Sequence, residues 1–511
     1  MTERVDLVGR SLSAATREAF ESRVDDQAAF LRDVLARGDL DTADFAVGME
    51  LEVYAVDSEG RLARLPDPVF ETCNPELGLH NAELNTDPDR LTTEGIEAQA
   101  AALREQWARA QEAAAAVDRE LVLDAMWTVP PAEGSREYLG TTDERDGVAV
   151  PANMRPVPRY WAIDRDVVDR AGGAIPFEVP GASLSFPSIL FESLATSIQP
   201  HVQIPSTDAF PAYYAAAIRT LGPLLALTAN SPFLPADCYD EAVDPEALLA
   251  ETHHELRIAA FEQSVNQTDP PKVRVPSDID ETADVIDEVV ADPLLAPFLS
   301  EWIEGGDESE AFADRFWEFD HKRGTYWRWL RAVIGGDPVP GAGDERSIRI
   351  EYRPIPTQPT ITDVVGCQCL VAGLVVGLVD ADHPLADLPW AAAEASFYAA
   401  VEDGLGADLA WVTADGKRTD DPAVIFEEVF AYARRGLRAQ GVDADVIDRD
   451  LGPLEARWDQ RRTPSRWKID RVRAALTDGA DLAGALAAMQ REYAALSREH
   501  DSFAEWPTVG E

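Results

Sequence analysis

Lysine is scarce in this chain: Lys272, Lys322, Lys417 and Lys468 are the only lysines among 511 residues. Lysine and arginine together number 45 against 93 aspartates and glutamates, which gives a formal net charge of −48. Because a nucleic-acid-binding surface needs a positive footprint, this charge argues against a non-specific polyanion binder. The acidic residues are spread along the whole chain, which fits either adaptation to high cytoplasmic salt or an ordinary acidic protein from a GC-rich genome.

Cysteine and long apolar runs are also scarce. The chain has four cysteines and no CxxC pair, so a zinc site or a thioredoxin-type motif has no support. The longest apolar run, residues 369–379, is too short to cross a bilayer of about 30 Å. The first residues are charged and contain no apolar segment of the kind found in secretory signals. We therefore expect a cytoplasmic protein with no membrane partner.

Hydrophobic periodicity places a few strands among many helices. Residues 130–190 are rich in Pro and Gly and read as irregular, whereas 11–38 and most of the chain after 390 read as helix. Strands are predicted at 45–56, 80–87, 121–129, 193–205 (broken at Pro200) and 347–353. Strands separated by helices and long connections are typical of an α+β fold in which one sheet is assembled from distant segments.

Two further segments invite a functional reading but have a simpler one. His253 and His254 are predicted on a helix, where neighbouring side chains diverge by about 100° and cannot easily share a metal ion. We expect both at the surface or an interface. Residues 317–331 are aromatic and basic, and we expect core packing in which the arginines extend to solvent.

Four of the predicted strands carry polar side chains on one face and apolar side chains on the other. The polar positions are Glu50 and Glu52, then Glu83 and Asn85, then His201 and Gln203, and finally Arg349, Glu351 and Arg353. Solvent on one face of an antiparallel sheet explains any single strand. It does not explain why one strand pairs glutamates and another interleaves Arg-Glu-Arg, since this surface should carry a mixture of Asp, Thr and Arg.

Carboxylates that face one another raise each other's pKa unless cations lie between them. Carboxylate oxygens suit Mg²⁺ or Mn²⁺, and bound Mg²⁺ usually shares its ligand shell with phosphate oxygens and water. The planar guanidinium of arginine binds phosphate or carboxylate through two parallel hydrogen bonds. Together these residue types predict metal ions held beneath a nucleotide, and phosphoryl transfer.

At these residues the sequence resembles the glutamate–cysteine ligase family and the wider carboxylate–amine ligases with a glutamine-synthetase-like catalytic sheet. The resemblance rests on the Gly-x-Glu-x-Glu strand at 48–52, the x-Glu-x-Arg strand at 350–353 followed by a helix led by Asp363, and the stretch LLALTANSPF at 224–233. It covers roughly residues 45–380.

The resemblance implies a mostly antiparallel curved sheet with one polar active-site face and helices on the other. The resemblance covers a catalytic domain at 45–380, and the helical periodicity predicts a helical insertion in it at about 243–330, an N-terminal helix within 1–44 and a helical region at 381–511. The implied cofactors are ATP and Mg²⁺ or Mn²⁺. The implied metal ligands are Glu50, Glu52, Glu83, Glu351 and His201, with Arg349 and Arg353 catalytic and with Asn85 and Gln203 binding substrate or nucleotide.

The implied reaction joins L-glutamate to an amine, most simply L-cysteine, through γ-glutamyl phosphate, a reaction of glutathione biosynthesis. Two alternatives stay open: a ligase of the same fold that uses a different amine, and a catalytically silent relative with a binding or regulatory role. The expected partners are small-molecule substrates, and neither nucleic acid nor membrane.

Overall fold

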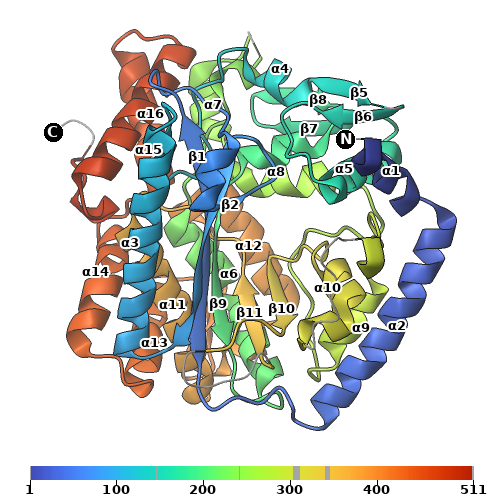
Figure 1. The fold of residues 1–511 in the computed structure, drawn as a ribbon. Helices are drawn as coiled ribbons and strands as arrows, with labels where there is room; N and C mark the ends of the chain where they lie inside the picture. The colour runs from blue at the N-terminus through green and yellow to red at the C-terminus, as the bar shows by residue number, and fades with distance from the viewer. Residues whose placement is uncertain (1, 146, 241, 303–310, 340–345, 509–511) are drawn as a thin grey trace.

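The computed structural model describes residues 2–145, 147–240, 242–302, 311–339 and 346–508. Its main sheet contains β1 (Ala46–Val56), β2 (Asn74–Pro75), β3 (Asn81–Arg90), β4 (Glu120–Val122), β9 (Ile198–Gln203), β10 (Leu330–Ile334) and β11 (Ile348–Tyr352). The strand order is β10-β11-β9-β1-β3-β2, with β4 paired to β1, and every pairing is antiparallel. The predicted α+β class with a sheet built from distant segments is confirmed (Figure 1).

Apolar side chains of the central strands form the face that packs against helices. Met49, Leu51 and Val53 of β1 are buried, as are Val202 of β9 and Ile350 of β11. The helices behind them are α3 (Thr93–Ala115), α6 (Phe210–Thr228) and α11 (Ile361–Asp380). Figure 1 shows α3 and α11 on one side of the sheet and α9, α10 and α2 on the other. The alternation of polar and apolar residues therefore decides which side of each strand faces the core.

Helix α11 crosses the centre of the molecule. Its N-cap is Thr360, whose side chain accepts a hydrogen bond from the backbone N–H of Asp363. In the described part of the chain it is the one helix long and apolar enough to span a membrane, but its most apolar stretch is 89% buried inside the protein. It is therefore a core helix, apolar all round because it is surrounded by other elements.

Pro200 does not break its strand, contrary to the sequence-based expectation. Strand β9 runs through it, with Pro200 opposite Met49 of β1. The N–H groups of Ile198 and Ile204 bond to Ile355 and Ile348 on the other side of β9, so by alternation the missing N–H of Pro200 faces that side too. The ladder with β11 ends at the pair His201–Glu351, so Pro200 removes no hydrogen bond from it.

The N-terminal segment forms two helices where one was expected. These are α1 (Thr2–Ser11) and α2 (Ala14–Ala36), and the hydroxyl of Ser13 caps α2 by accepting from the backbone N–H of Thr16. Helix α2 packs along α9 (Asp284–Ala291) and α10 (Trp317–Arg323). The expected end near Gly38 is confirmed, since that glycine follows the helix at φ +69°.

The middle of the chain is more regular than the sequence indicated. Residues 130–190, expected to be irregular, contain α4 (Ser135–Gly140), the hairpin β5 (Thr142–Arg145) and β6 (Val148–Pro151), α5 (Pro158–Arg170), and the hairpin β7 (Ile175–Val179) and β8 (Ala182–Phe186). The strand expected at 121–129 is paired only over Glu120–Val122. Short strands carry too few residues for their alternation to stand out.

The two adjacent histidines lie between helices and not on one. His253 and His254 connect α7 (Pro245–Glu251) to α8 (Leu256–Val265). Both are partly buried, and His254 Nδ1 lies 2.9 Å from Ser465 Oγ. Burial lowers the pKa of His254 to about 4. The expected helical placement was therefore wrong, whereas partial exposure is compatible with the expected surface or interface position.

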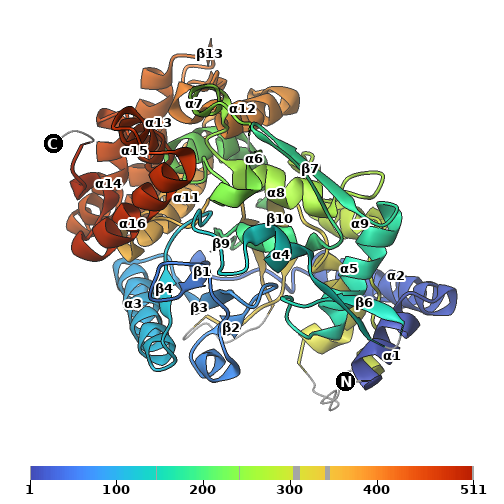
Figure 2. The same cartoon turned by 90° about the horizontal axis from the view of Figure 1, so that it is seen from above.

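The C-terminal region is mainly helical, as expected, but contains a small hairpin. Its elements are α12 (Trp390–Asp403), β12 (Trp411–Val412), β13 (Arg418–Thr419), α13 (Pro422–Ala439), α14 (Ala444–Asp459), α15 (Pro464–Thr477) and α16 (Leu482–Glu499). Two buried ion pairs fix this region to the rest: Lys468 with Asp124 at 2.5 Å, and Arg457 with Asp363 at 2.8 Å. Figure 2 shows α14, α15 and α16 gathered beside α11.

Candidate active site

The register of the sheet brings the predicted polar positions onto one face. Residues directly opposite one another in antiparallel strands project to the same side. The opposed pairs are Glu52–Glu83, Glu50–Asn85, Glu50–Gln199, His201–Glu351 and Gln203–Arg349. Arg353 follows the end of β11 and reaches the same face, since its Nη1 donates to Glu351 and to Gln199. All nine residues predicted for the site therefore lie on the side of the sheet opposite the buried core.

One half of this face, which we call the arginine-paired half, holds Glu50, His201 and Glu351 together with Arg331, Arg349 and Arg353. Arg331 Nε donates to Glu351 Oε2 at 2.5 Å, and Arg353 Nη1 donates to Glu351 Oε1. Glu351 is only 1% exposed, and burial alone would raise its pKa. The charges of Arg331 and Arg353 outweigh burial and hold that pKa well below its ordinary value. The carboxylate is therefore ionised and already neutralised by protein groups.

His201 connects Glu50 to this arrangement. Arg349 Nε donates to His201 Nδ1 at 2.8 Å, so Nδ1 carries the lone pair and Nε2 of the neutral ring carries the proton. Nε2 lies 3.3 Å from Glu50 Oε1. Burial would raise the pKa of Glu50, but its contact with His201 lowers it overall. In this arrangement His201 orients Glu50, and it becomes a metal ligand only if the ring turns over or Arg349 withdraws.

A pair of glycines positions Arg349. Its Nη1 donates to the backbone carbonyl of Gly335, directly after β10. Gly336 has a φ of +141°, and a Cβ at that position would collide with the guanidinium group. The turn therefore needs glycine for both its conformation and its close approach to the arginine.

The other half of the face, which we call the carboxylate-rich half, holds Glu52, Glu76, Glu83 and Glu192. Among the residues that the structure describes, none of these four carboxylates forms an ion pair. Glu52 accepts hydrogen bonds from the backbone N–H of Ser197 at 2.6 Å and from Gln199 Nε2 at 3.1 Å. Asn85 Nδ2 donates to Glu83 Oε1 at 2.9 Å. These partners are neutral, so no positive group contacts the carboxylates of the cluster directly.

The pKa values in the carboxylate-rich half move in the opposite direction from those of Glu351 and Glu50. Burial, followed by the charges of Glu76, Glu50 and Glu52, raises the pKa of Glu83 well above its ordinary value. Burial, with repulsion from Glu52 and Glu192, raises the pKa of Glu76 to about 8. Burial also raises the pKa of Glu52. Carboxylates in this state are stabilised by a bound cation.

The donor atoms fit divalent metal ions of the Mg²⁺ or Mn²⁺ type. Candidate ligand atoms of Glu50, His201 and Glu351 lie within 4.8 Å of one another. Glu52 and Glu83 add carboxylate oxygens from directly opposed positions. Asn85 Oδ1 and His201 Nε2 are buried polar atoms without a hydrogen-bond partner in the described structure. Oxygen-rich ligand sets with one imidazole suit hard cations that keep several water or phosphate ligands.

Comparison with known families gives an independent result. Residues 46–496 match the model of "Glutamate-cysteine ligase family 2 (GCS2)", which is most of the chain. The chain belongs to glutamate–cysteine ligase family 2. The resemblance stated from the strand motifs is therefore confirmed, and the matched residues also include α12 to α15 and most of α16.

Solved structures place this family 2 chain on a known fold. The crystal structure of glutamate–cysteine ligase from Francisella tularensis in complex with AMP matches with a TM-score of 0.50 at 14% identity, covering 90% of each chain. A bifunctional glutathione synthetase from Pasteurella multocida matches with a TM-score of 0.48 at 14% identity, covering 93% of this chain and 55% of that one. A novel glutamine synthase homolog matches with a TM-score of 0.28 at 12% identity, covering 93% and 75%. No curated protein matches significantly.

Two cavities of this family 2 protein were considered as ligand-binding sites. A cavity of about 130 Å³ lies beside the arginine-paired half, and its walls include the predicted residues Asn85 and Gln203 with Glu50, His201 and Arg349. Ligand pockets usually measure roughly 300–1,000 Å³, so this space suits only the charged end of a larger ligand.

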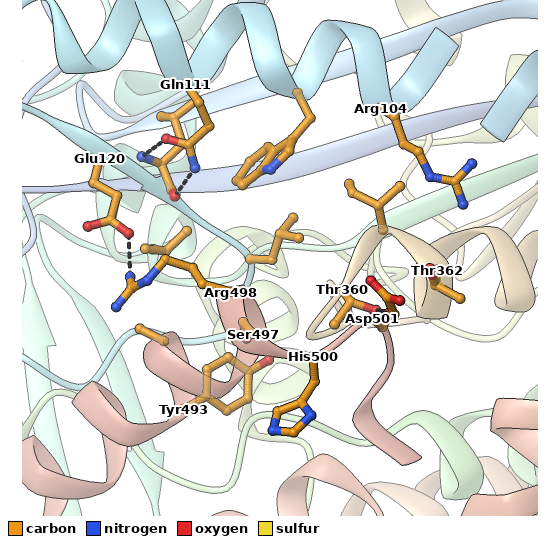
Figure 3. Close-up of a pocket in the computed structure, with 16 residues that line it drawn as sticks. Arg104, Gln111, Glu120, Thr360, Thr362, Tyr493, Ser497, Arg498, His500 and Asp501 are labelled. Atoms are coloured by element: carbon orange, nitrogen blue, oxygen red, sulfur yellow. Dashed lines mark hydrogen bonds and ion pairs between the residues drawn. The ribbon is translucent and has the colours of Figure 1, made fainter. Parts of the chain in front are cut away.

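The larger cavity, about 350 Å³, lies between α3, β4, the start of α11 and the end of α16 (Figure 3). None of the nine predicted residues lines it. Its polar groups are partly satisfied: Arg498 pairs with Glu120, and the Gln111 side chain exchanges two hydrogen bonds with the backbone of Leu121. The candidate catalytic face is therefore chosen by its chemistry and not by the volume of the nearest cavity.

Sequence reasoning missed several residues on or beside this face, including Arg331, Glu76 and Arg257. Arg331 lies on β10, where Leu330, Ala332 and Ile334 alternate with it, and that alternation before Gly335 was the available signal. Glu76 follows the two-residue strand β2, where no periodicity exists. Arg257 is buried at the start of α8, where its charge interacts with Glu52 and with Arg353.

The Ala-Asn-Ser-Pro stretch at 229–232 helps to hold Arg257 in place. Ser231 Oγ donates to Glu255 Oε1 at 2.5 Å, and Arg257 Nε donates to the same carboxylate at 3.2 Å. Arg257 Nη2 also donates to the backbone carbonyl of Pro354, next to Arg353. The motif therefore fixes a buried guanidinium beside the candidate catalytic face.

Proposed function

We propose that this chain is an ATP-dependent ligase that joins L-glutamate to an amine, with L-cysteine the first candidate, through γ-glutamyl phosphate. The family assignment supports a carboxylate–amine ligase. The observation that carries the proposal is the division of one sheet face into an arginine-paired half and a carboxylate-rich half. The arginines suit anionic substrates and the glutamates of both halves suit cations, and the reaction proposed here uses both.

Glu50, Glu52, Glu83 and Glu351 are the proposed metal ligands, and Glu76 is added to them on the evidence of its position. His201 joins the set if its ring turns over. Bound Mg²⁺ or Mn²⁺ supplies charge neutralisation for the transferring phosphoryl group. The carboxylates of the chain hold the cations in place, and their mutual repulsion makes cation binding favourable.

Arg349 and Arg353 are the proposed catalytic arginines. Both guanidinium groups lie on the same face as the proposed metal ligands and present planar donors suited to phosphate or carboxylate oxygens. Arg353 keeps an unpartnered buried Nε, which leaves a donor free for a ligand. Asn85 and Gln203 line the small cavity next to Arg349 and are proposed to contact substrate or nucleotide.

Experiment can distinguish two alternatives: a ligase with a different acceptor amine, and a catalytically silent relative without turnover. The complete set of carboxylates and arginines favours an active enzyme.

The division into an N-terminal segment at 1–44, a catalytic domain at 45–380 and a helical region at 381–511 stays a prediction, as does a cytoplasmic location. The acidic composition makes high-salt buffer a sensible first condition.

The test is ADP release from ATP, measured in high KCl with Mg²⁺ or Mn²⁺. We expect release that depends on glutamate and increases with one member of a panel of amines. Dependence on cysteine supports the glutamate–cysteine reaction, whereas stimulation by another amine supports a related ligase. Absence of glutamate-dependent ADP release with every amine and both metals would contradict the proposal.

A further inference from the structure

Gln199 is a buried residue of β9 that lies outside the set predicted from the sequence. It is opposite Glu50 in the register of the sheet and is only 4% exposed. Its amide bonds to two groups of the candidate face: Nε2 donates to Glu52 Oε1 at 3.1 Å, and Oε1 accepts from Arg353 Nη1 at 2.5 Å. Gln199 therefore joins the arginine-paired half to the carboxylate-rich half.

The neighbours of Gln199 determine which way its amide points. The guanidinium of Arg353 can only donate hydrogen bonds, so the amide oxygen must face it and the amide nitrogen must face Glu52. Glu52 is held in turn, because its other oxygen accepts hydrogen bonds from the backbone N–H and the hydroxyl of Ser197, at 2.6 and 3.2 Å. The amide of Gln199 is therefore fixed at both ends.

These contacts decide which edge of Arg353 is available to a ligand. Nη1 carries two protons, and Glu351 and Gln199 each accept one hydrogen bond from it. Nε is buried without a hydrogen-bond partner, and in the described part of the chain Nη2 forms no hydrogen bond either. Because Nε and Nη2 donate side by side in one plane, this edge of the guanidinium fits two oxygens of a single anionic group.

Glutamine is the residue type that suits this position. An acidic residue would repel Glu52, and a basic residue would repel Arg353. An apolar residue of the same length would leave one proton of Nη1 unsatisfied, and the guanidinium would then be free to turn about its remaining bond to Glu351. A neutral amide avoids both repulsions, since it accepts from one neighbour and donates to the other.

We propose that Gln199 is a positioning residue of the ligase reaction, which fixes Arg353 so that its Nε–Nη2 edge binds two oxygens of one substrate anion. This inference rests on the proposed ligase function. The anion is the transferring phosphoryl group or the α-carboxylate of glutamate, which share this chemistry. Gln199 acts through Arg353 and need not contact a substrate itself.

The experiment is a double-mutant cycle of Gln199→Met and Arg353→Lys, with steady-state kinetics in ATP and glutamate. Methionine has nearly the length of glutamine but neither its donor nor its acceptor. We expect Gln199→Met alone to lower kcat about 10-fold if Arg353 binds the phosphoryl group, or to raise the glutamate KM about 10-fold if it binds the α-carboxylate. Because lysine lacks the fork, the same change in the Arg353→Lys background should have a further effect of less than about two-fold.

Calorimetric titration with glutamate distinguishes the two anions without turnover. If Arg353 binds the α-carboxylate, the affinity of Gln199→Met for glutamate should fall about 10-fold, since a charged hydrogen bond is lost or displaced. If Arg353 binds the phosphoryl group, that affinity should stay at the wild-type value. Gln199→Asn keeps an amide but is one methylene shorter, so it should lose one of the two bonds and give the same pattern where Gln199→Met does not fold.

A second buried glutamine provides the control. Gln490 on α16 is similarly buried and also bridges two groups, Thr128 and Asp124. Gln490→Met should lower the free energy of unfolding, measured by urea titration, but leave kcat and both KM values unchanged.

The outcomes separate this role from the ligase function. Equal losses from Gln199→Met in the wild-type and Arg353→Lys backgrounds, or unchanged kinetics in Gln199→Met, would overturn the positioning role, while glutamate-dependent ADP release by wild type upholds the ligase. Absence of that release from wild type with every amine and both metals would overturn both.

Discussion

The arginine-paired half and the carboxylate-rich half sit side by side on one sheet face, yet their glutamates behave in opposite ways. Burial is the largest influence on Glu351 and on Glu83 alike. Around Glu351, Arg331 and Arg353 overcome it and the pKa falls, whereas around Glu83 the neighbouring charges are negative and the pKa rises. The comparison teaches that burial alone does not set the charge state, because the sign of the neighbouring charges decides it.

This difference means that the two halves depend on a bound cation to different degrees. In the arginine-paired half the carboxylate of Glu351 already has positive partners, since Arg331 and Arg353 pair with it. The carboxylate-rich half is incomplete, since Glu52, Glu76 and Glu83 repel one another without a cation. Metal binding should therefore change the second half much more than the first, and mutations in the two halves should have different signatures.

The largest effect is expected when the arginine-paired half loses its central charge. Glu351→Gln leaves Arg331 and Arg353 buried without their shared carboxylate, and removing one partner of a buried ion pair costs about 3–5 kcal/mol. We expect that loss in the free energy of unfolding, measured by urea titration without metal. Glu83→Gln is the matched control, since the same change there removes repulsion and should leave stability unchanged or increased. Equal losses in both variants would contradict the distinction between the halves.

The next effect concerns activity. Glu52→Gln keeps the shape of a side chain in the carboxylate-rich half but removes one charge from the proposed metal site. We expect ATP turnover to fall at least about 100-fold, since comparable losses follow removal of a group that supports transition-state charge. Circular dichroism should show an intact fold. Wild-type turnover at saturating Mg²⁺ would make Glu52 a structural residue only.

A smaller effect is expected in the pH dependence of the unfolding free energy, which a bound metal ion should change. The pKa of Glu76 is raised to about 8 in the folded protein from an ordinary value of 4.5. A carboxyl whose folded pKa is raised contributes its stability below pH 4.5 and loses it as pH rises towards 8. For metal-free protein we expect Glu76→Gln to flatten the decline in unfolding free energy across this window. Saturating Mg²⁺ should flatten it in wild type as well, because the cation stabilises the ionised form. A slope that neither change alters would argue against a cation site at Glu76.

The sequence predicted the site residues that belong to strands in which polar and apolar side chains alternate. Glu50, Glu52, Glu351 and Arg353 could be found because each lies in or next to a strand whose apolar residues occupy alternate positions. The core side of each strand, and therefore the side of the site, follows from that alternation.

Residues on short turns carry no such signal. Glu76 and Glu192 lie on a two-residue strand end and a 3₁₀ turn, so only the folded structure brings them to the sheet. Arg331 was missed because β10 follows an aromatic segment that conceals its alternation. The direction of each glutamate's pKa shift was out of reach for a related reason, since it depends on neighbours such as Arg331 that are distant in sequence.

The smallest effect tests whether the two halves share a ligand at Arg353. Its Nη1 bridges Glu351 and Gln199, and Gln199 in turn donates to Glu52, so this arginine touches both halves. Arg353→Lys keeps the charge but loses the planar fork. If Arg353 contacts the transferring phosphoryl group, kcat should fall about 10-fold, because that contact strengthens as charge develops in the transition state.

If Arg353 instead binds the α-carboxylate of glutamate, the KM for glutamate should rise while kcat changes little. We favour the phosphoryl role, because the bond between Arg353 and Glu351 places the guanidinium beside the proposed metal ligands. Steady-state kinetics with ATP and glutamate varied separately distinguish the two. A variant with unchanged kcat and unchanged KM for both substrates would show that Arg353 serves only to neutralise Glu351, and the arginine-paired half would then be a structural element next to the reaction.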